Sequence, residues 1–352
     1  MSDKLFLLPG PSRVDRRVPK YLSDAYDEGF MSYNHRSPQV IELIKKTTGI
    51  MRKRLNIPAD YTITFVSSAT ECWQIIAQSL IKKKSCHIYN GSFGEKWYNN
   101  TVKLGFEAKP VEFDINEDIP VDKIQEIKAD TFCITHNETS NGTALSKEEI
   151  LALRQVQGKA ILAVDATSSM AGYKLPFNLA DVWYASVQKC FGLPAGMGVL
   201  ILSPRAVERA FKLNNTNHYN SLVNIINQAS QFQTTHTPNV LDIYLMNRVL
   251  KKRKNIDKVH EDLKSRYKKI EQTVSENNSV DWLVTNIDKR SYTVLALKYL
   301  PNDISIYQLA DDTQIVLGKG YGKWKENTFR VANFPALRKR EINKLLNFLE
   351  VI

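Results

Sequence analysis

The chain has 352 residues, of which 43% are hydrophobic and 24% charged, and this composition is typical of globular proteins rather than disordered, collagenous or coiled-coil ones. The length favours about two domains. Lys and Arg number 48 against 37 Asp and Glu, a net charge of +11 that fits an anionic partner without selecting among nucleic acid, an anionic surface and anionic metabolites.

Short apolar runs alternate with helical patterns between residues 40 and 205, which predicts a parallel sheet with crossover helices. We expect helices at Cys72–Ile81 and in the segment ending near Leu104. The expected strands, in chain order, are Thr62–Val66, His87–Tyr89, Phe132–Thr135, Ala160–Val164, Val182–Ser186 and Gly198–Leu202. The last four are apolar enough to be covered on both faces.

A long helical pattern runs from about Leu241 to Asn277, and we expect it to connect a large domain to a smaller α/β unit. The domains are predicted at residues 15–250 and 251–352, with residues 1–14 packed beside the smaller one. In the smaller unit we expect strands near Asp281–Thr285, Tyr292–Leu297 and Thr328–Ala332 and a closing helix at Lys339–Leu349.

Polar residues follow three of the central strands. In open α/β sheets ligands bind beyond the carboxyl ends of the strands, so these clusters should converge on one crevice. The three clusters are His136-Asn137-Glu138-Thr139, Asp165-Ala166-Thr167 and Gln188-Lys189.

Two residues of these clusters suggest imine chemistry. Lys189 lies between an apolar strand and a glycine-bearing stretch, where burial would lower its pKa and supply the neutral amine that reacts with a carbonyl; the alternative is a lysine that extends to solvent. Asp165 ends a strand that should be central, and a buried carboxylate requires a cation or donors. A protonated pyridine nitrogen would be a suitable partner for the carboxylate of Asp165. The alternative is that Asp165 caps a helix.

Two turns could hold other parts of a flat, phosphorylated cofactor. Ser67-Ser68-Ala69-Thr70-Glu71 joins a strand to a helix and would present N–H and O–H donors to an anion, although Ser-x-x-Glu capping uses the same residues. In Gly91-Ser92-Phe93-Gly94, the ring of Phe93 could lie against a cofactor ring or simply pack in the core.

These motifs, in this order, resemble the class V pyridoxal-phosphate aminotransferases, and the resemblance covers nearly the whole chain. It implies a fold type I α/β transferase, with a mostly parallel seven-stranded sheet flanked by helices and a smaller C-terminal α/β domain. Three further segments belong to the same family pattern: Pro9-Gly10-Pro11-Ser12, Asn34-His35-Arg36-Ser37-Pro38 and Phe329-Arg330-Val331-Ala332-Asn333-Phe334.

The resemblance also implies residue roles. Lys189 would be the catalytic lysine that forms the imine with pyridoxal 5′-phosphate, Asp165 would pair with the pyridine nitrogen, and Phe93 would stack on the ring. Arg330 would bind the substrate α-carboxylate. The remaining implied contacts are Thr139 to the phenolic oxygen, Ala69, Thr70 and Gln188 to the phosphate, His236 and Thr237 to the same phosphate from a neighbouring subunit of a homodimer, and His35 and Arg36 to the substrate's distal anionic group.

Two branches of the family compete. Phosphoserine aminotransferases, which act in serine biosynthesis, carry a His-Arg pair shortly before the carboxylate arginine, and here the loop reads Gly318-Lys319-Gly320-Tyr321-Gly322-Lys323-Trp324-Lys325. The run from His136 to Gly142 and the basic charge favour the phosphoserine branch, with glutamate and 2-oxoglutarate as the exchanging pair. The alternative is an alanine–glyoxylate or serine–pyruvate enzyme.

Several other classes are not supported. The cysteines at 72, 86, 133 and 190 show no metal-ligand spacing, and none follows residue 190, where a cysteine desulfurase would need its nucleophile. No window is apolar enough for a membrane span, and no nucleic-acid-binding signature occurs. We therefore expect a cytoplasmic enzyme of amino and keto acids, with no metal, membrane or nucleic-acid partner.

Overall fold

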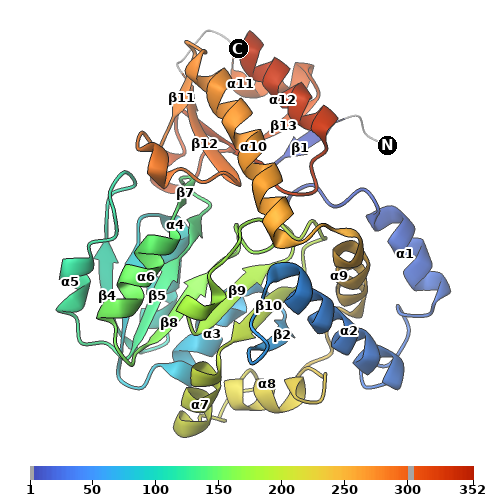
Figure 1. Ribbon diagram of the computed structural model, residues 1–352, viewed down its shortest axis with the longest axis vertical. Coiled ribbons are helices and arrows are strands. Elements are labelled where there is room, and N and C mark those ends of the chain that lie inside the picture. Colours follow the sequence, from blue (N-terminus) through green and yellow to red (C-terminus); the bar gives the residue numbers. More distant parts are fainter. Residues whose placement is uncertain (1–3, 300–304) are drawn as a thin grey trace.

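Two β-sheets organise the chain in the computed structural model, which describes residues 4–299 and 305–352 (Figure 1). The larger sheet has seven strands within these ranges, and β10 runs antiparallel to both of its neighbours while all other pairs are parallel. Its order is β2 (Thr62–Val66), β10 (Gly198–Leu202), β9 (Val182–Ser186), β8 (Ile161–Asp165), β5 (Thr131–Thr135), β3 (Lys84–Tyr89) and β4 (Glu107–Glu112). The predicted mostly parallel α/β sheet is confirmed.

Strand β4 was not expected from the sequence. It lies at the edge of the sheet, and its residues Glu-Ala-Lys-Pro-Val-Glu are mostly polar, with Pro110 in the middle. Charged side chains and proline are tolerated on edge strands because one side of the backbone needs no partner.

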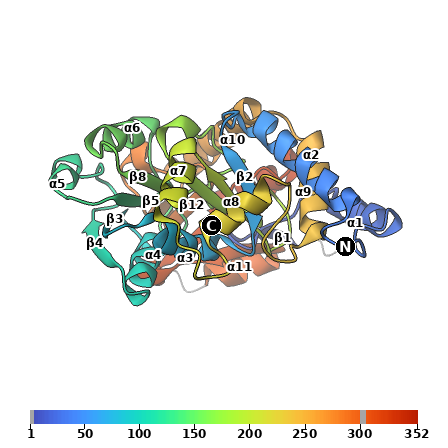
Figure 2. The ribbon, with the colours of Figure 1, turned by 90° about the horizontal axis from the view of Figure 1, so that it is seen from below.

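Helices cover both faces of the large sheet, and the alternation of side chains along each strand explains why. In β8, Ile161 and Ala163 pack on one face, while Leu162 and Val164 pack on the other. The first face is covered by α3 (Ala69–Leu80), α4 (Ser92–Lys103), α7 (Pro204–Leu213) and α8 (Leu222–Ala229). The second is covered by α2 (Pro38–Leu55), α5 (Val121–Gln125), α6 (Lys147–Val156) and α9 (Val240–Lys252), as Figure 2 shows for α2 and α9. Helix α1 (Val18–Asp27) packs against α9.

The smaller sheet lies at the top of Figure 1 and has its own apolar core. Its order is β1 (Leu5–Leu7), β13 (Ile315–Lys319), β14 (Thr328–Ala332), β12 (Val294–Tyr299) and β11 (Val280–Trp282). Helices α10 (Ile256–Ser275), α11 (Ile306–Asp312) and α12 (Lys339–Val351) pack on it. Shorter elements are β6 (Asn137–Glu138), β7 (Thr143–Ala144), η1 (Phe177–Leu179), η2 (Ile287–Lys289) and η3 (Gly322–Trp324). The domain boundary near residue 250 stays a prediction.

The expected single helix from Leu241 to Asn277 is wrong, since α9 and α10 are separate. Arg253 leaves the helical conformation with φ −80° and ψ 148°, and the Asn255 side chain caps α10 by accepting from the backbone N–H of Lys258. The guanidinium of Arg253 turns inward and donates to the carbonyls of Cys190 (2.7 Å) and Phe191 (2.8 Å). The capping and these long-range bonds stabilise the break.

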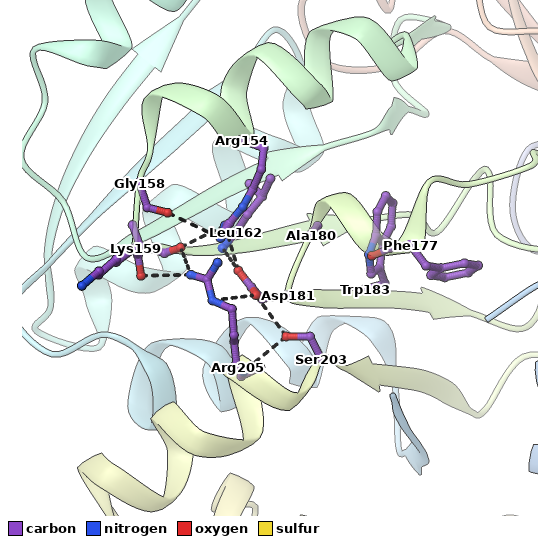
Figure 3. Close-up of polar contacts among 12 residues, drawn as sticks. Arg154, Gly158, Lys159, Leu162, Phe177, Ala180, Asp181, Trp183, Ser203 and Arg205 are labelled. Atoms are coloured by element: carbon purple, nitrogen blue, oxygen red, sulfur yellow. Dashed lines mark hydrogen bonds and ion pairs between the residues drawn. The ribbon is translucent and has the colours of Figure 1, made fainter. Parts of the chain in front are cut away.

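A buried carboxylate ties the helices to the amino-terminal end of the large sheet (Figure 3). Asp181 precedes β9 and accepts from the backbone N–H of Leu162 (2.9 Å), from Ser203 Oγ (3.0 Å) and from the Arg154 guanidinium (3.1 Å). Arg205 also approaches it, at 3.6 Å. This network aligns β8, β9 and β10 at the end of β9 opposite to Lys189.

Candidate active site

A cavity of about 200 Å³ opens where the carboxyl ends of β5, β8 and β9 meet the smaller sheet. Eight of the residues predicted for the site line it: Ala69, Thr70, Phe93, Thr139, Asp165, Gln188, Lys189 and Arg330. Asn137 and Thr167, members of the predicted polar clusters without an assigned role, line it as well. Six others were not predicted: Pro9, Gly10, Trp73, Thr135, Ser186 and Tyr321. The fold therefore brings the three polar clusters to one place.

Lys189 is 6% exposed, and its ammonium group has only neutral hydrogen-bond partners among the described residues. Nζ donates to Thr139 Oγ1 (2.8 Å) and to Ser168 Oγ (2.9 Å). Burial lowers the pKa of Lys189 to about 8, although the nearby carboxylates of Asp165 and Glu138 favour the charged form. The amine is thus held in one orientation, with part of it unprotonated near neutral pH.

Asp165 ends β8 on the cavity wall and is 5% exposed. Its Oδ1 accepts from the backbone N–H of Thr167 (2.8 Å), so the turn that follows β8 also uses this carboxylate. Burial raises the pKa of Asp165, while hydrogen bonding from Thr167 and the charge of Lys189 oppose the rise. A cationic N–H group in the cavity would stabilise the charged carboxylate further.

The turn before α3 both caps the helix and lines the cavity, so it fits the two interpretations of its sequence, a helix cap and an anion-binding turn. Ser68 Oγ accepts from the Glu71 N–H (3.1 Å), and Glu71 Oε2 accepts from the Ser67 N–H (2.8 Å), so the helix is capped. Ala69 and Thr70 still line the cavity at the first turn, where helix N–H groups attract anions. Gly198 allows β10 to approach, since an added Cβ there would lie 2.7 Å from the Ser68 carbonyl carbon.

Phe93 is positioned by a buried glutamate, Glu138, which the sequence placed in the crevice cluster without giving it a role. Glu138 Oε2 accepts from the backbone N–H groups of Phe93 (3.1 Å) and Gly94 (3.2 Å). Its Oε1 accepts from the N–H (2.9 Å) and the hydroxyl (2.6 Å) of Ser140. Gly91 is needed beside it, since a Cβ there would lie 2.3 Å from Glu138 Cγ. The signal in the sequence for the role of Glu138 was the Asn-Glu-Thr motif to which it belongs.

Arg330 brings a guanidinium group to the cavity from the smaller sheet. Its Nε donates to the carbonyl of Lys319 (2.8 Å) and its NH1 to the carbonyl of Thr139 (2.9 Å). No carboxylate lies within ion-pair distance of it in the described ranges, and burial lowers its pKa. A buried guanidinium group without an ion-pair partner favours a carboxylate ligand, whose two oxygens match the planar N–H groups of arginine.

The amino-terminal segment closes another side of the cavity. Gly10 has φ +148°, and a Cβ there would lie 2.8 Å from Lys189 Cε, so only glycine fits without displacing the lysine. The backbone N–H of Ser12 donates to the carbonyl of Gln188 (3.0 Å). This contact explains the place of the Pro-Gly-Pro-Ser motif in the fold.

Four of the predicted site residues lie outside this cavity: His35, Arg36, His236 and Thr237. Arg36 donates to the side chains of Gln228 and Gln233, and burial together with Arg36 and His236 lowers the pKa of His35. Arg36 and Thr237 are exposed. Within a single chain, these four residues are not part of the site around Lys189.

The cavity suits pyridoxal phosphate. Lys189 offers an amine, Asp165 a carboxylate, the first turn of α3 an anion cradle, and Phe93 an aromatic ring. In addition, Thr135 Oγ1 is buried on the cavity wall with no hydrogen-bond partner among the described side chains and backbone, as expected for a group that meets a ligand. Elsewhere, no described helix reaches the length and apolarity of a membrane span, and no described trio of His, Cys, Asp or Glu gathers as a metal site.

The sheet order, the cavity and its lysine define a fold type I pyridoxal-phosphate-dependent transferase. Residues 9–320 match the family model described as aminotransferase class-V, and the chain belongs to this family. A phosphoserine aminotransferase from Rhodococcus opacus is 25% identical over 97% of this chain and 93% of its own.

Solved structures show the same relationship. A phosphoserine aminotransferase from Cytophaga hutchinsonii is 31% identical, with a TM-score of 0.95 over 100% of this chain and 99% of its own. An alanine–glyoxylate aminotransferase from a Nostoc species shares the fold with a TM-score of 0.81 at 19% identity, over 99% and 94% of the two chains.

Proposed function

We propose that this protein transfers the amino group of L-glutamate to 3-phosphohydroxypyruvate, giving phosphoserine and 2-oxoglutarate in serine biosynthesis. The observation that carries the reaction type is one cavity lined by the buried Lys189, by Asp165 and by Arg330, which has no ion-pair partner among the described residues. The choice of substrate is supported by the names of the relatives from Rhodococcus and Cytophaga. We place the enzyme in the cytoplasm, in keeping with four buried free cysteines.

Residues of this chain would hold pyridoxal phosphate in defined ways. Lys189 would bond its aldehyde, Asp165 would pair with the ring nitrogen, and Phe93 would stack on the ring. The other contacts would be made by Thr139 at the phenolic oxygen and by Ala69, Thr70 and Gln188 at the phosphate. When bound, the cofactor supplies an aldehyde that condenses with amines and a ring that withdraws electron density from the substrate Cα.

The side chains of the site then bind and orient the substrate and move its proton. Arg330 binds the α-carboxylate and thereby directs the Cα–H bond toward Lys189. Lys189 Nζ removes the Cα proton, and its lowered pKa keeps part of the amine free to do so near neutral pH. The hydroxyls of Thr139 and Ser168 orient Nζ between successive proton transfers.

A homodimer with shared active sites is part of the proposal. His236 and Thr237 of the partner subunit would complete the phosphate site, and His35 and Arg36 would reach a substrate across the subunit interface. Their separation from the cavity of their own chain supports this assignment. Sedimentation of the purified protein would give twice the monomer mass. A Lys189→Ala chain co-assembled with a His236→Ala chain would regain part of the activity that each variant lacks alone.

The main test compares two reactions of the purified holoenzyme. We expect glutamate-dependent formation of phosphoserine to exceed transamination between alanine and glyoxylate, whereas the reverse order would assign the chain to the alanine–glyoxylate branch. That second candidate is favoured by one observation, since Lys189 and Arg330 are the only cations on the described cavity wall.

Lys189→Ala tests the reaction type. It should lower kcat by about a thousandfold or more while circular dichroism and sedimentation stay unchanged. The matched control is Lys159→Ala, at an exposed lysine on the opposite end of the sheet, which should retain full activity. Retained activity in Lys189→Ala would contradict the assignment.

A further inference from the structure

The loop between β13 and β14 places an aromatic residue at the cavity mouth. Tyr321 lines the cavity, and its ring stacks on Phe93 with centroids 5.3 Å apart and planes 17° apart. Gly322, at φ +57°, allows the loop to lie on the start of α4, because an added Cβ would be 2.2 Å from Ser92 Oγ. The Gly-Tyr-Gly motif is thereby explained as a device that positions the Tyr321 ring.

Two cations flank this ring. The guanidinium carbon of Arg330 lies 5.1 Å from the Tyr321 centroid, and Lys96 Nζ lies 4.7 Å from it. Lys96 is three residues after Phe93 on α4, a spacing that places both side chains on one face of the helix, and its Nζ also lies 5.5 Å from the Phe93 centroid. The two charges are therefore held near each other by one aromatic platform.

Lys96 has capacity to bind an anion. Its ammonium donates to Tyr321 Oη, which leaves two of its three N–H groups and the Tyr321 hydroxyl proton for another acceptor. No carboxylate pairs with Lys96 in the described part of the chain. Lys323, in the same loop, instead pairs with Glu112 at 3.4 Å. Like Lys319, Lys323 and Lys325, Lys96 is not part of the cavity wall, but its Nζ contacts Tyr321, which is.

We propose that Lys96, together with the Tyr321 hydroxyl, binds the distal phosphate of the substrate while Arg330 binds its α-carboxylate. This inference rests on the proposed function and names the specificity determinant of that site. A substrate with two anionic ends requires two cationic sites, and among the described residues of this chain the cavity wall offers Arg330 besides the catalytic Lys189. At the distal end, Lys96 would act together with His35 and Arg36, which we proposed above to reach the substrate across the subunit interface. Lys96 contributes to this second site from outside the cavity wall, through its contact with Tyr321.

The test compares substrates with and without a distal anion. Lys96→Met should lower kcat/KM for phosphoserine about 10- to 100-fold, chiefly through KM, and change the slow reaction of L-alanine less than about twofold. Lys96→Arg should retain most of the activity. Lys103→Met, a matched control on the same helix, should behave as the wild type.

A binding measurement without turnover completes the test. Calorimetry of the holoenzyme with 4-phosphonobutyrate, a carboxylate and a phosphonate on one short chain, should show a Kd raised at least about tenfold by Lys96→Met, whereas the Kd of butyrate should not change. Equal losses for phosphoserine and alanine would reduce Lys96 to a structural role. A loss in Lys323→Met but not in Lys96→Met would move the phosphate site to Lys323.

The two proposals fail in distinguishable ways. If the wild-type enzyme prefers alanine to phosphoserine, the proposed function fails and the role of Lys96 fails with it. If the wild type prefers phosphoserine and Lys96→Met leaves that preference unchanged, only the role of Lys96 is refuted.

Discussion

Glu138→Gln isolates the electrostatic role of a side chain that never reaches solvent. Glu138 is 1% exposed, and its two carboxylate oxygens receive four hydrogen bonds, two from the start of α4 and two from Ser140. Glutamine has the same shape but only one acceptor oxygen. Its NH₂ group must therefore face two donors, either the N–H groups of Phe93 and Gly94 or the groups of Ser140.

The expected cost follows from these bonds. Each hydrogen bond to a charged group contributes about 1.5 to 3 kcal/mol, and the loss of two is partly offset because the buried charge is removed as well. We expect a net destabilisation of about 2 to 4 kcal/mol. With an unfolding entropy of about 2 cal/mol/K per residue, that corresponds to a Tm lowered by about 3 to 5 °C.

The assay is thermal unfolding of the cofactor-free protein, followed by titration with pyridoxal phosphate. Glu138→Gln should lower Tm and also weaken cofactor binding, because the backbone of Phe93 loses its anchor. The control is Glu95→Gln, at an exposed position on α4, the helix that Glu138 anchors. It should change neither Tm nor the affinity for the cofactor. A Glu138→Gln protein with wild-type Tm and cofactor affinity would refute the reasoning.

Two further predictions concern pH. Burial lowers the pKa of Lys189 to about 8, so the rate at which cofactor-free protein takes up pyridoxal phosphate should rise with pH through a midpoint near 8. Stopped-flow absorbance measures this rate, and a midpoint near 10 would contradict the lowered pKa of Lys189. Burial raises the pKa of Asp242 to about 7, so the folded state binds the proton of this carboxyl group more tightly than the unfolded state does. The free energy of unfolding therefore falls as pH rises from about 4 to 7, where the carboxyl group must ionise. Asp242→Asn should therefore raise Tm by a few degrees at pH 8 relative to wild type and by less at pH 5; an equal shift at both values would disprove the role of the charge.

Local sequence predicted much of the architecture. The runs Thr62–Val66, Val182–Ser186 and Gly198–Leu202 are strands with the expected bounds. The last two are continuous apolar runs, as burial on both faces requires, and the first is rich in β-branched residues. The polar residues that follow β5, β8 and β9 could be assigned to one crevice, since parallel strands end at the same edge. The edge strand β4 was not predicted because its mostly polar residues show no sustained alternation of apolar and polar positions. The break at Arg253 was not predicted because it depends on hydrogen bonds to residues distant in the chain, which leave no periodic pattern.

The order of motifs along the chain determined by itself the class of fold, the family resemblance and the candidate lysine, Lys189. Only the tertiary structure decided how Glu138 holds the start of α4 and how Lys96 meets Tyr321, 225 residues away in the chain. Periodicity reports which side chains are buried in their own helix or strand. The pairing of distant groups depends instead on how close the packed elements come, and here the glycines at positions 91 and 322 set that approach.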